Sequence, residues 1–565
     1  MTRSRRTTLL VVCGMLLAAL VSTDPALAVK PPKKEKTIDV QLLAINDFHG
    51  NLQPPSGSSG RINTPVGPVD AGGVEYLSTH LKQLEQTNKY SVVVAAGDLI
   101  GASPLLSALF HDEPTIEAMN VAGLDIASVG NHEFDEGSAE LLRMQNGGCH
   151  PADGCQDGDP FDGADFQYLS ANVVREDTGE TLLPAYEIRK FKNVRVAFIG
   201  MTLEATPTIV TPSGVAGLDF RDEVETVNAL VPELRARKVE TIVVLIHEGG
   251  LPTGFYNECP GISGPIVDIV NNLDDAVDVV VSGHTHQAYN CVIDGKPVTS
   301  ASSFGRLVTD IDLTIDRRTA DVKSVSVNNV IVTRDVAPDP VQTALIAKYD
   351  AVAAPLANRV IGQVTADITR TANTAGESAL GDVIADAQLD ATDEPDFGDA
   401  VVAFMNPGGI RADLTFAQGG SEGDGNVTFG EAFTVQPFGN SLVTMTLTGA
   451  QIDTLLEQQF DNPAPGQSRM LQISDGFSYT WDAAAPVGSR IDPASIVIDA
   501  APLDLTASYR VTVNSFLADG GDNFTVLRDG TDRLGGEVDL DALVTYFGTS
   551  SPVAPGPQDR ITRLN

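Results

Sequence analysis

Basic residues are scarce in this 565-residue sequence. Only 37 Lys and Arg stand against 75 Asp and Glu, which gives a formal net charge of −38. A polyanion of this strength repels nucleic acid and acidic membrane surfaces, so neither is an expected partner. If the ligands are anionic, local cations must overcome that field, and bound metal ions are the obvious source. An acidic surface also favours solubility, and both explanations apply.

Long apolar runs are also rare. One occupies residues 9–21, after three arginines and ahead of the small-x-small pattern at residues 26–28. This arrangement is typical of a secretory signal, and we expect cleavage near Ala28 and export to an extracellular or periplasmic location. No later stretch approaches the ~20 apolar residues of a membrane-spanning helix, so no transmembrane segment is predicted. Loss of residues 1–28 removes three Arg and one Asp and takes the net charge to −40.

Cysteine is limited to five residues, of which Cys13 lies in the signal. The other four fit no zinc-binding spacing that we can identify. In an oxidising compartment they favour two local disulfides, Cys149–Cys155 and Cys259–Cys291. A cysteine metal site is the alternative.

The length of the chain exceeds what one hydrophobic core supports, so at least two domains are expected. From residue 37 to about 332, short β-branched runs alternate with amphipathic stretches, which indicates a layered α/β architecture. The runs predicted as strands are residues 37–45, 91–97, 125–130, 166–173, 194–200, 240–246, 277–283 and 309–316.

A change in the pattern of residues near position 339 divides the chain. Residues 340–360 have helical spacing, and beyond them a predicted helix at 377–391 mixes with strands at 400–406 and 510–516. The predicted organisation is a signal at 1–28, an α/β-sandwich domain at 37–335, a linker helix at 336–361 and a second, α+β substrate-binding domain at 362–565.

Metal-binding side chains follow five of the apolar runs. They are Asp47 and His49 of "INDFHGN", Asp98, Asn131, His247, and His284 and His286 of "SGHTHQ". Side chains two apart on an extended segment point the same way, so each D-x-H or H-x-H pair can chelate one cation. Ligands of open α/β sheets bind beyond the carboxyl ends of strands, where five such ends can converge.

Seven N and O donors exceed what one ion takes from a protein, whereas two ions that share a carboxylate fit them well. Asp98 is the natural bridge. Five of the eight histidines, the four donors and His132 beside Asn131, lie at these strand ends. The other three, His80, His111 and His150, are expected to be structural.

The motifs "NDFHG", "GD", "GNHEFD", "H" and "GHTH", in that order, closely resemble the calcineurin-like metallophosphoesterases. The sequence is similar to the exported 5′-nucleotidase branch, of the bifunctional UDP-sugar hydrolase type. The resemblance implies two divalent ions, Mn, Zn or Co. One ion would take Asp47, His49, Asp98 and His286, and the other Asp98, Asn131, His247 and His284. It also implies a catalytic pair in which Asp135 orients His132.

The second block contains "NPGGIR", "PFG" and "FLADGGDNF". By themselves, phenylalanines near turns usually cap a core. These motifs, however, resemble the nucleotidase C-terminal signature, which implies a nucleotide site made by Asn406, Gly408, Gly409, Arg411, Phe438, Phe516 and Asp522. The two aromatics would sandwich the base, Asp522 would bind ribose, and Arg411 would lie near phosphate.

One feature departs from that signature. The arginine expected a few residues before Glu377 is missing, and the nearest one is Arg370. The prediction of specificity for monophosphates therefore has less support than the prediction of hydrolysis.

The leading hypothesis is an exported dimetal phosphohydrolase that removes phosphate from extracellular nucleotides, a 5′-nucleotidase of nucleotide salvage. Alternative substrates are 2′,3′-cyclic nucleotides, UDP-sugars and nucleoside di- or triphosphates. A hypothesis of another class is a non-catalytic nucleotide- or metal-binding surface protein. The pair His132 and Asp135 favours the enzyme, because a binding module has no need of it.

Overall fold

The computed structural model describes residues 36–565 except 56, 211 and 421. The predicted signal at residues 1–28 lies outside the described residues. Thr37–Asn565 forms one compact unit.

Two six-stranded sheets form the first half of this unit. The first has the order β16-β15-β1-β4-β5-β6 and the second β13-β14-β12-β11-β9-β8. The first sheet consists of β1 (Thr37–Ile45), β4 (Ser91–Ala96), β5 (Ile126–Ser128), β6 (Gln167–Leu169), β15 (Leu307–Asp316) and β16 (Val322–Ile331). The second consists of β8 (Tyr186–Phe191), β9 (Val194–Thr202), β11 (Thr241–His247), β12 (Val277–Ser282), β13 (Ala288–Ile293) and β14 (Lys296–Ala301). The neighbours β1, β4, β5 and β6 are parallel, as are β9, β11 and β12.

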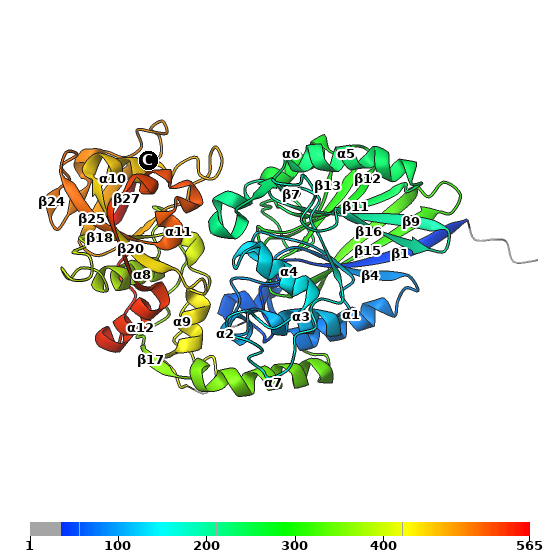
Figure 1. Cartoon of the computed structure of the whole chain (residues 1–565), viewed down its shortest axis with the longest axis horizontal. Helices are drawn as coiled ribbons and strands as arrows, with labels where there is room; N and C mark the ends of the chain where they lie inside the picture. Colours follow the sequence, from blue (N-terminus) through cyan, green and yellow to red (C-terminus); the bar gives the residue numbers. More distant parts are fainter. Residues whose placement is uncertain (1–35, 56, 211, 421) are drawn as a thin grey trace, which may run out of the picture. The chain divides into compact units, whose positions relative to one another are not determined.

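The central strands are apolar on both faces because both faces are covered. On β1, Val40 and Leu42 pack into a core between the two sheets, together with Val243 of β11. Leu43 and Ile45, which point the other way, pack against helices. Those helices are α1 (Val74–Glu85), α3 (Glu113–Ala122) and α4 (Ser138–Asn146), and α5 (Glu223–Ala236) and α6 (Pro265–Asn272) cover the second sheet. Figure 1 shows α5 and α6 on the opposite side of the strands from α1 and α3.

Helix α7 (Pro340–Ala357) follows this sandwich. Asp339 caps the start of this helix, and its carboxylate accepts hydrogen bonds from the amides of Val341 and Gln342. Tyr349 and Ala353 are buried in the same apolar cluster as α1 and α3. The body of the predicted linker helix is therefore part of the first core.

The second half combines a five-stranded sheet, β21-β18-β25-β20-β26, with a four-stranded sheet, β24-β23-β22-β27. The strands are β18 (Val402–Met405), β20 (Ser441–Thr448), β21 (Gln472–Ile473), β22 (Phe477–Asp482), β23 (Val497–Ile498), β24 (Ala501–Pro502), β25 (Ser508–Asn514), β26 (Thr531–Val538) and β27 (Ile561–Leu564). The helices are α8 (Ala379–Asp390), α9 (Phe429–Val435), α10 (Gly449–Glu457), α11 (Ser515–Ala518) and α12 (Asp539–Ser550). The predicted nucleotide-binding residues lie in the segments between these elements, except Phe516, which lies in α11.

The predicted fold class, an α/β sandwich followed by an α+β domain, is confirmed, and both predicted disulfides are present. One strand prediction was wrong. Residues 166–173 form two strands, β6 and β7 (Val173–Arg175), because the chain leaves the first sheet after Leu169 and β7 pairs with β10 (Leu218–Phe220). Among the described residues, no helix is both long and apolar enough to cross a membrane.

Candidate active site

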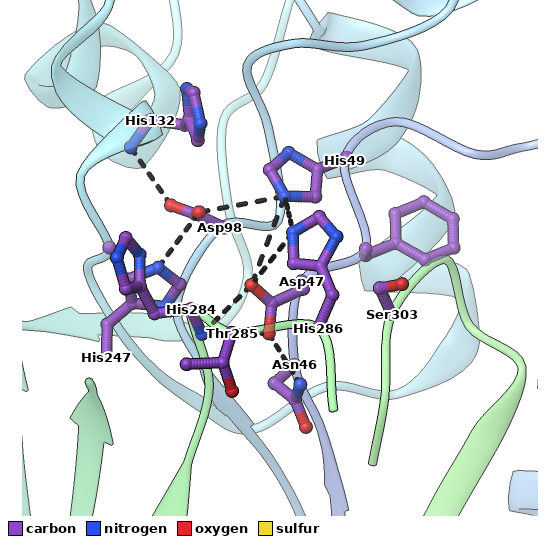
Figure 2. Close-up of polar contacts among 12 residues, drawn as sticks. Asn46, Asp47, His49, Asp98, His132, His247, His284, Thr285, His286 and Ser303 are labelled. Atoms are coloured by element: carbon purple, nitrogen blue, oxygen red, sulfur yellow. Dashed lines mark hydrogen bonds and ion pairs between the residues drawn. The ribbon is translucent and has the colours of Figure 1, made fainter. Parts of the chain in front are cut away.

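The structure brings the seven predicted donors to the carboxyl ends of five strands. Asp47 and His49 follow β1, Asp98 follows β4, Asn131 follows β5, His247 ends β11, and His284 and His286 follow β12. Ion pairs and short contacts between their nitrogen and oxygen atoms link them into one cluster, which Figure 2 shows for the donors other than Asn131. Each strand supplies rigid backbone up to the point where a donor is needed.

The sequence reasoning assumed that the segments carrying these donors are extended. The structure shows that they are not. The backbone φ angles of Asp47, His49, His284 and His286 are 49°, 46°, 70° and 55°, all in the left-handed region. Asp98 has a φ angle of 49°. This conformation is uncommon for residues other than glycine, and it is held here by the surrounding structure. Tight turns therefore aim these side chains inward.

Asp47, His49 and His286 form the first group of candidate ligands. The Nε2 atoms of His49 and His286 are 3.1 Å apart, and that of His286 is 3.4 Å from Oδ1 of Asp47. Nδ1 of His49 donates to the carbonyl of Gly101 at 2.8 Å. Because a neutral imidazole has one N–H, this bond leaves a lone pair on Nε2, which faces the cluster.

Asp98, His247 and His284 form the second group. Nε2 of His247 is 2.9 Å from Oδ2 of Asp98, while its Nδ1 donates to the carbonyl of Ala96 at 2.8 Å. Nδ1 of His284 is 3.1 Å from Oδ1 of Asn131. Oδ2 of Asp98 also lies 3.6 Å from Nε2 of His49, so this carboxylate adjoins both groups.

The donor set fits divalent cations. The Nε2 atoms of His49 and His286 face each other at 3.1 Å, a spacing that is favourable when both bind one cation. Nε2 of His247 is buried without a well-aligned hydrogen bond. Burial lowers the pKa of His49 and of His286 well below the usual value, so both imidazoles are neutral, as ligation requires. Burial also opposes charge on His247, but Asp98 outweighs it and raises the pKa to about 10. His247 therefore has to release a proton when it binds a cation.

The pair His132 and Asp135 lies beside these groups. Nδ1 of His132 is 2.8 Å from Oδ2 of Asp135, and its backbone amide donates to Oδ1 of Asp98 at 2.9 Å. Burial acts to lower the pKa of His132, but the carboxylates of Asp135 and Asp98 outweigh it, so the pKa is raised. The imidazole is thus oriented by a carboxylate and disposed to hold a proton.

Glu133 is a buried carboxylate to which the sequence reasoning gave no role. It is 2% exposed and accepts hydrogen bonds from the amides of Asp98, Leu99 and Gly130 at 3.0, 2.8 and 2.5 Å. It therefore ties the loop after β4 to the loop after β5. The signal in the sequence was an acidic residue inside "GNHEFD", between residues that already had functions.

One cavity joins this site to the second half of the chain. From the first half its walls include Asn131, His132, Asp135 and His284. The ring of Phe438 lies parallel to that of His132, with centres 5.7 Å apart. From the second half the walls include all seven predicted nucleotide-binding residues, which are Asn406, Gly408, Gly409, Arg411, Phe438, Phe516 and Asp522. The guanidinium of Arg411 is 5.8 Å from the centre of the Phe438 ring.

Asp522 is held in a polar network in this cavity. Its Oδ2 accepts from Nδ2 of Asn406 at 2.9 Å, and Oδ1 of Asn406 accepts from Asn514 at 3.0 Å. Nη1 of Arg469 lies 2.8 Å from Oδ1 of Asp522. Arg469 was not predicted from the sequence, although it is the one basic residue in the Pro- and Gly-containing stretch at 461–471.

Arg370 reaches the loop that carries Arg411. Its Nη1 donates to the carbonyl of Ile410 at 3.2 Å. Burial lowers the pKa of Arg411, and the charge of Arg370 lowers it further. Although no arginine lies immediately before Glu377, a second cation therefore lies close to Arg411.

Two family models match the chain. Residues 40–288 match the calcineurin-like phosphoesterase model, and residues 360–529 match the 5′-nucleotidase C-terminal domain. The cell wall protein Lmo0130 of Listeria monocytogenes is 31% identical over 96% of this chain and 71% of its own length. The chain belongs to the 5′-nucleotidase family of calcineurin-like phosphoesterases. The resemblance seen in the sequence is thereby confirmed.

A solved structure supports the same assignment. The 5′-nucleotidase precursor from Thermus thermophilus has a TM-score of 0.75 and 28% identity, over 94% of this chain and all of its own. Endonuclease YhcR of Bacillus subtilis is 33% identical over 93% of this chain, which spans 41% of the length of that relative.

The prediction of an enzyme is confirmed: members of this family are metal-dependent phosphoester hydrolases of the 5′-nucleotidase type.

Proposed function

We propose that this phosphohydrolase is exported and removes phosphate from extracellular nucleotides, as part of nucleotide catabolism and salvage. The observation that carries the proposal is the shared cavity. His132, Asn131 and His284 line it together with Phe438, Phe516 and Asp522, so one ligand can contact both the metal-binding cluster and the aromatic side chains. The strong negative charge of the chain argues against a polynucleotide substrate.

The cluster would hold two divalent ions, Mn²⁺, Zn²⁺ or Co²⁺. One ion would take Asp47, His49, Asp98 and His286, and the other Asp98, Asn131, His247 and His284. Bound ions supply Lewis acidity at the phosphoryl group and lower the pKa of water. Oδ2 of Asp98 is within 3.6 Å of imidazoles of both groups, which supports its role as the bridge.

His132 is the proposed proton donor. Asp135 fixes the ring through Nδ1, which leaves Nε2 to donate to a phosphoryl oxygen or to the leaving oxygen as negative charge develops. The carboxylates of Asp135 and Asp98 raise the pKa of His132 against the effect of burial, which favours the protonated ring that a proton donor needs. Arg411 would neutralise the phosphate from the other side of the cavity.

The nucleoside would lie in the second half of the cavity. Phe438 and Phe516 would hold the base by stacking, which contributes ~1–3 kcal/mol per base. Asp522, oriented by Asn406 and Arg469, would accept a hydrogen bond from a ribose hydroxyl. The backbone at Gly408 and Gly409 would allow close approach of the ligand.

A specific observation favours nucleoside di- and triphosphates as additional substrates. Arg370 and Arg411 lie beside and in the cavity in addition to Arg469, which pairs with Asp522, and together they give more positive charge than one phosphate requires. Arg469 lines the same cavity as His284 of the metal-binding cluster.

The test is a substrate panel with Mn²⁺ present. We would measure kcat/KM for AMP, ADP, ATP, UDP-glucose, 2′,3′-cyclic AMP and p-nitrophenyl phosphate in wild type, Phe438→Ala and Phe516→Ala. KM for nucleotides should rise roughly 5- to 150-fold in each variant, while p-nitrophenyl phosphate, which lacks a base, should be barely affected. Equal losses on both kinds of substrate would make the aromatics structural and remove the support for a nucleotide.

A further inference from the structure

One imidazole outside the metal-binding cluster is held between two carboxylates. His111 lies in the turn between α2 (Leu105–Ala108) and α3. Its Nδ1 is 2.8 Å from Oε2 of Glu136, and its Nε2 is 2.9 Å from Oδ2 of Asp153. An ionised carboxylate only accepts hydrogen bonds, so both ring nitrogens must donate, and an imidazole that donates twice is a cation. His111 is therefore an imidazolium ion that joins two segments of the chain.

The second carboxylate belongs to a loop that a disulfide closes. Cys149 is joined to Cys155, and His150 and Asp153 lie between them. The amide of Asp153 donates to Nδ1 of His150 at 3.2 Å, so this nitrogen carries a lone pair and the ring is neutral. The neutral ring stacks on that of His111, with centres 3.7 Å apart. The loop thus presents a carboxylate and an uncharged aromatic face to the imidazolium ion.

The charge of His111 depends on the carboxylates that face it. Glu136, Asp153 and Glu140 of α4 all favour the protonated ring, and the hydrogen bond to Glu136 has the largest effect. Together they outweigh burial and raise the pKa of His111 to about 9. Glu140 is also paired with Arg143, whose Nε lies 2.9 Å from both of its carboxylate oxygens. Since the pKa is raised, the imidazolium ion is present at neutral pH and is lost as pH rises through about 9.

One connection from His111 to the proposed proton donor runs along the chain. Glu136, which holds Nδ1 of His111, directly follows Asp135. Oδ2 of Asp135 in turn holds Nδ1 of His132 at 2.8 Å. Helix α4 begins at Ser138, so the segment between the pair and the helix is short. A shift of Glu136 therefore moves Asp135 and, with it, the imidazole of His132.

A second connection passes through the residue after His111. Oδ2 of Asp112, which is buried, accepts from the amide of Gly101 at 3.0 Å. Gly101 lies directly against the pair: a Cβ atom on this residue would be 2.7 Å from Cβ of His132 and 2.9 Å from Oδ2 of Asp135. The turn that contains His111 thus also fixes the backbone on which both side chains of the pair rest.

We propose that His111 is a positioning residue for phosphoester hydrolysis: as an imidazolium ion between Glu136 and Asp153, it fixes Asp135 and so aligns His132 with the phosphoryl group. The inference rests on the proposed role of His132 as proton donor. Among the residues that line the described substrate cavity His111 is not found, so it acts through other residues. A displacement of about 1 Å at a catalytic group can lower the rate by up to about 10²-fold. Loss of the imidazolium ion should therefore lower kcat and leave KM nearly unchanged.

The first test determines whether His111 acts through His132. We would measure kcat and KM for p-nitrophenyl phosphate at about pH 7.5 and saturating Mn²⁺ in wild type, His111→Gln, His132→Ala and the double variant. His111→Gln alone should lower kcat about 5- to 50-fold, with KM within about twofold of wild type. In the His132→Ala background the same change should lower kcat by less than about twofold, because the side chain that His111 positions is absent.

An equal fall of kcat in both backgrounds would overturn the proposal, as would an unchanged kcat in His111→Gln. Wild-type kcat in His132→Ala alone would instead refute the proposed proton donor, and this inference with it. The matched control is His80→Gln, which changes the remaining histidine outside the active site. Nε2 of His80 contacts the carbonyl of Thr333 at 3.1 Å, and this variant should keep the kcat of wild type.

The second test uses pH. The kcat of wild type divided by that of His111→Gln should be largest near pH 7 and approach 1 above about pH 10, where wild type has also lost the imidazolium ion. Asp153→Asn removes one of the two carboxylates, so its kcat should decline at lower pH than that of wild type. Because Asp153 is exposed, this variant decides the question even if His111→Gln does not fold. A constant ratio, or an Asp153→Asn profile that matches wild type, would overturn the proposal.

Discussion

At the scale of single residues, one buried carboxylate organises the backbone of the metal-binding cluster. Glu133 accepts hydrogen bonds from the backbone amides of Asp98 and Leu99 and from that of Gly130, which precedes Asn131. Several amides that share one carboxylate fix two loops at once. The positions of the proposed bridging ligand and of a second ligand thus depend on a residue that binds neither metal nor substrate.

We therefore predict that Glu133→Gln weakens metal binding about 10- to 100-fold, the range seen when a supporting residue of a metal site is lost. The new NH₂ group faces amides that need an acceptor, so the loops should shift. Activity titrated against Mn²⁺ should move to higher metal concentration and recover in part at saturation. Glu204→Gln, a change of an exposed glutamate, is the control. An unchanged metal requirement in Glu133→Gln would contradict this positioning role.

His132 permits a sharper test, because its ring also lies within ligand distance of His49 and Asp98. As a proton donor it should be dispensable for metal binding. We predict that His132→Ala retains both ions while kcat falls roughly 10²- to 10⁴-fold. Elemental analysis and steady-state kinetics on the same sample measure the two effects. If the variant loses an ion, His132 is a ligand and the proposed role is wrong.

Metal dependence itself is tested at Asp98. Chelation should abolish phosphatase activity, and Mn²⁺, Zn²⁺ or Co²⁺ should restore it. Asp98→Asn, which removes the charge adjoining both ligand groups, should reduce activity more than His286→Asn, which changes one terminal ligand. The comparison uses kcat at saturating Mn²⁺. Full activity in a sample that contains no metal by elemental analysis would contradict the proposed mechanism with two metal ions.

At the scale of elements, β11 and β12 hold His247 and the two histidines of "SGHTHQ" in register. Asp278 of β12 accepts a hydrogen bond from the amide of Ile242 of β11 at 2.9 Å. Burial raises the pKa of Asp278 to about 7, so the carboxyl is neutral in the folded protein under mildly acidic conditions. The unfolded chain ionises it near pH 3.9.

Because the folded pKa is the higher one, stability from neutral Asp278 is complete below about pH 4 and is lost as pH rises through 7. Asp278→Asn cannot ionise. Its melting temperature relative to wild type should therefore rise from pH 4 to pH 8. Thermal unfolding across that range measures the effect, with the exposed Asp275→Asn as a control. A constant difference between Asp278→Asn and wild type would show that the group does not titrate as expected.

At the scale of the whole molecule, the two halves divide the work. The first half carries the metal-binding cluster, and the second adds the aromatic part of the cavity. Helix α7 belongs with the first half, since Tyr349 and Ala353 are buried in its core. A boundary drawn ahead of α7 would expose that part of the core.

We predict that a fragment of residues 37–358 folds and hydrolyses p-nitrophenyl phosphate with Mn²⁺, whereas residues 37–335 give a less stable protein. Relative to p-nitrophenyl phosphate, kcat/KM for AMP should fall by at least about 25-fold in the longer fragment, the product of two weak stacking contacts. Melting temperatures and the two rates provide the measurements. Retained preference for AMP would place the base-binding residues in the first half.

Much of this organisation was predictable because it is written in local patterns. Strands buried on both faces read as continuous apolar runs, as in "QLLAI" and "TIVVLI", and donors placed directly after them lie at a sheet edge whatever the loops do. The two disulfides were predictable from short-range spacing and compartment. The family motifs then limited the chemistry to phosphoester hydrolysis.

Tertiary structure alone decided which distant groups meet. The left-handed turns at Asp47 and His284, the amides gathered by Glu133 and the pairing of Arg469 with Asp522 join residues that no periodicity connects. The same is true of His111 and His150, which are 39 positions apart in the chain but stack in the fold. The sequence by itself determined the sheets, the strand-end donors and the class of reaction, since each depends on neighbouring residues. Convergence of separate loops depends on how sheets and helices pack, and that was visible only in three dimensions.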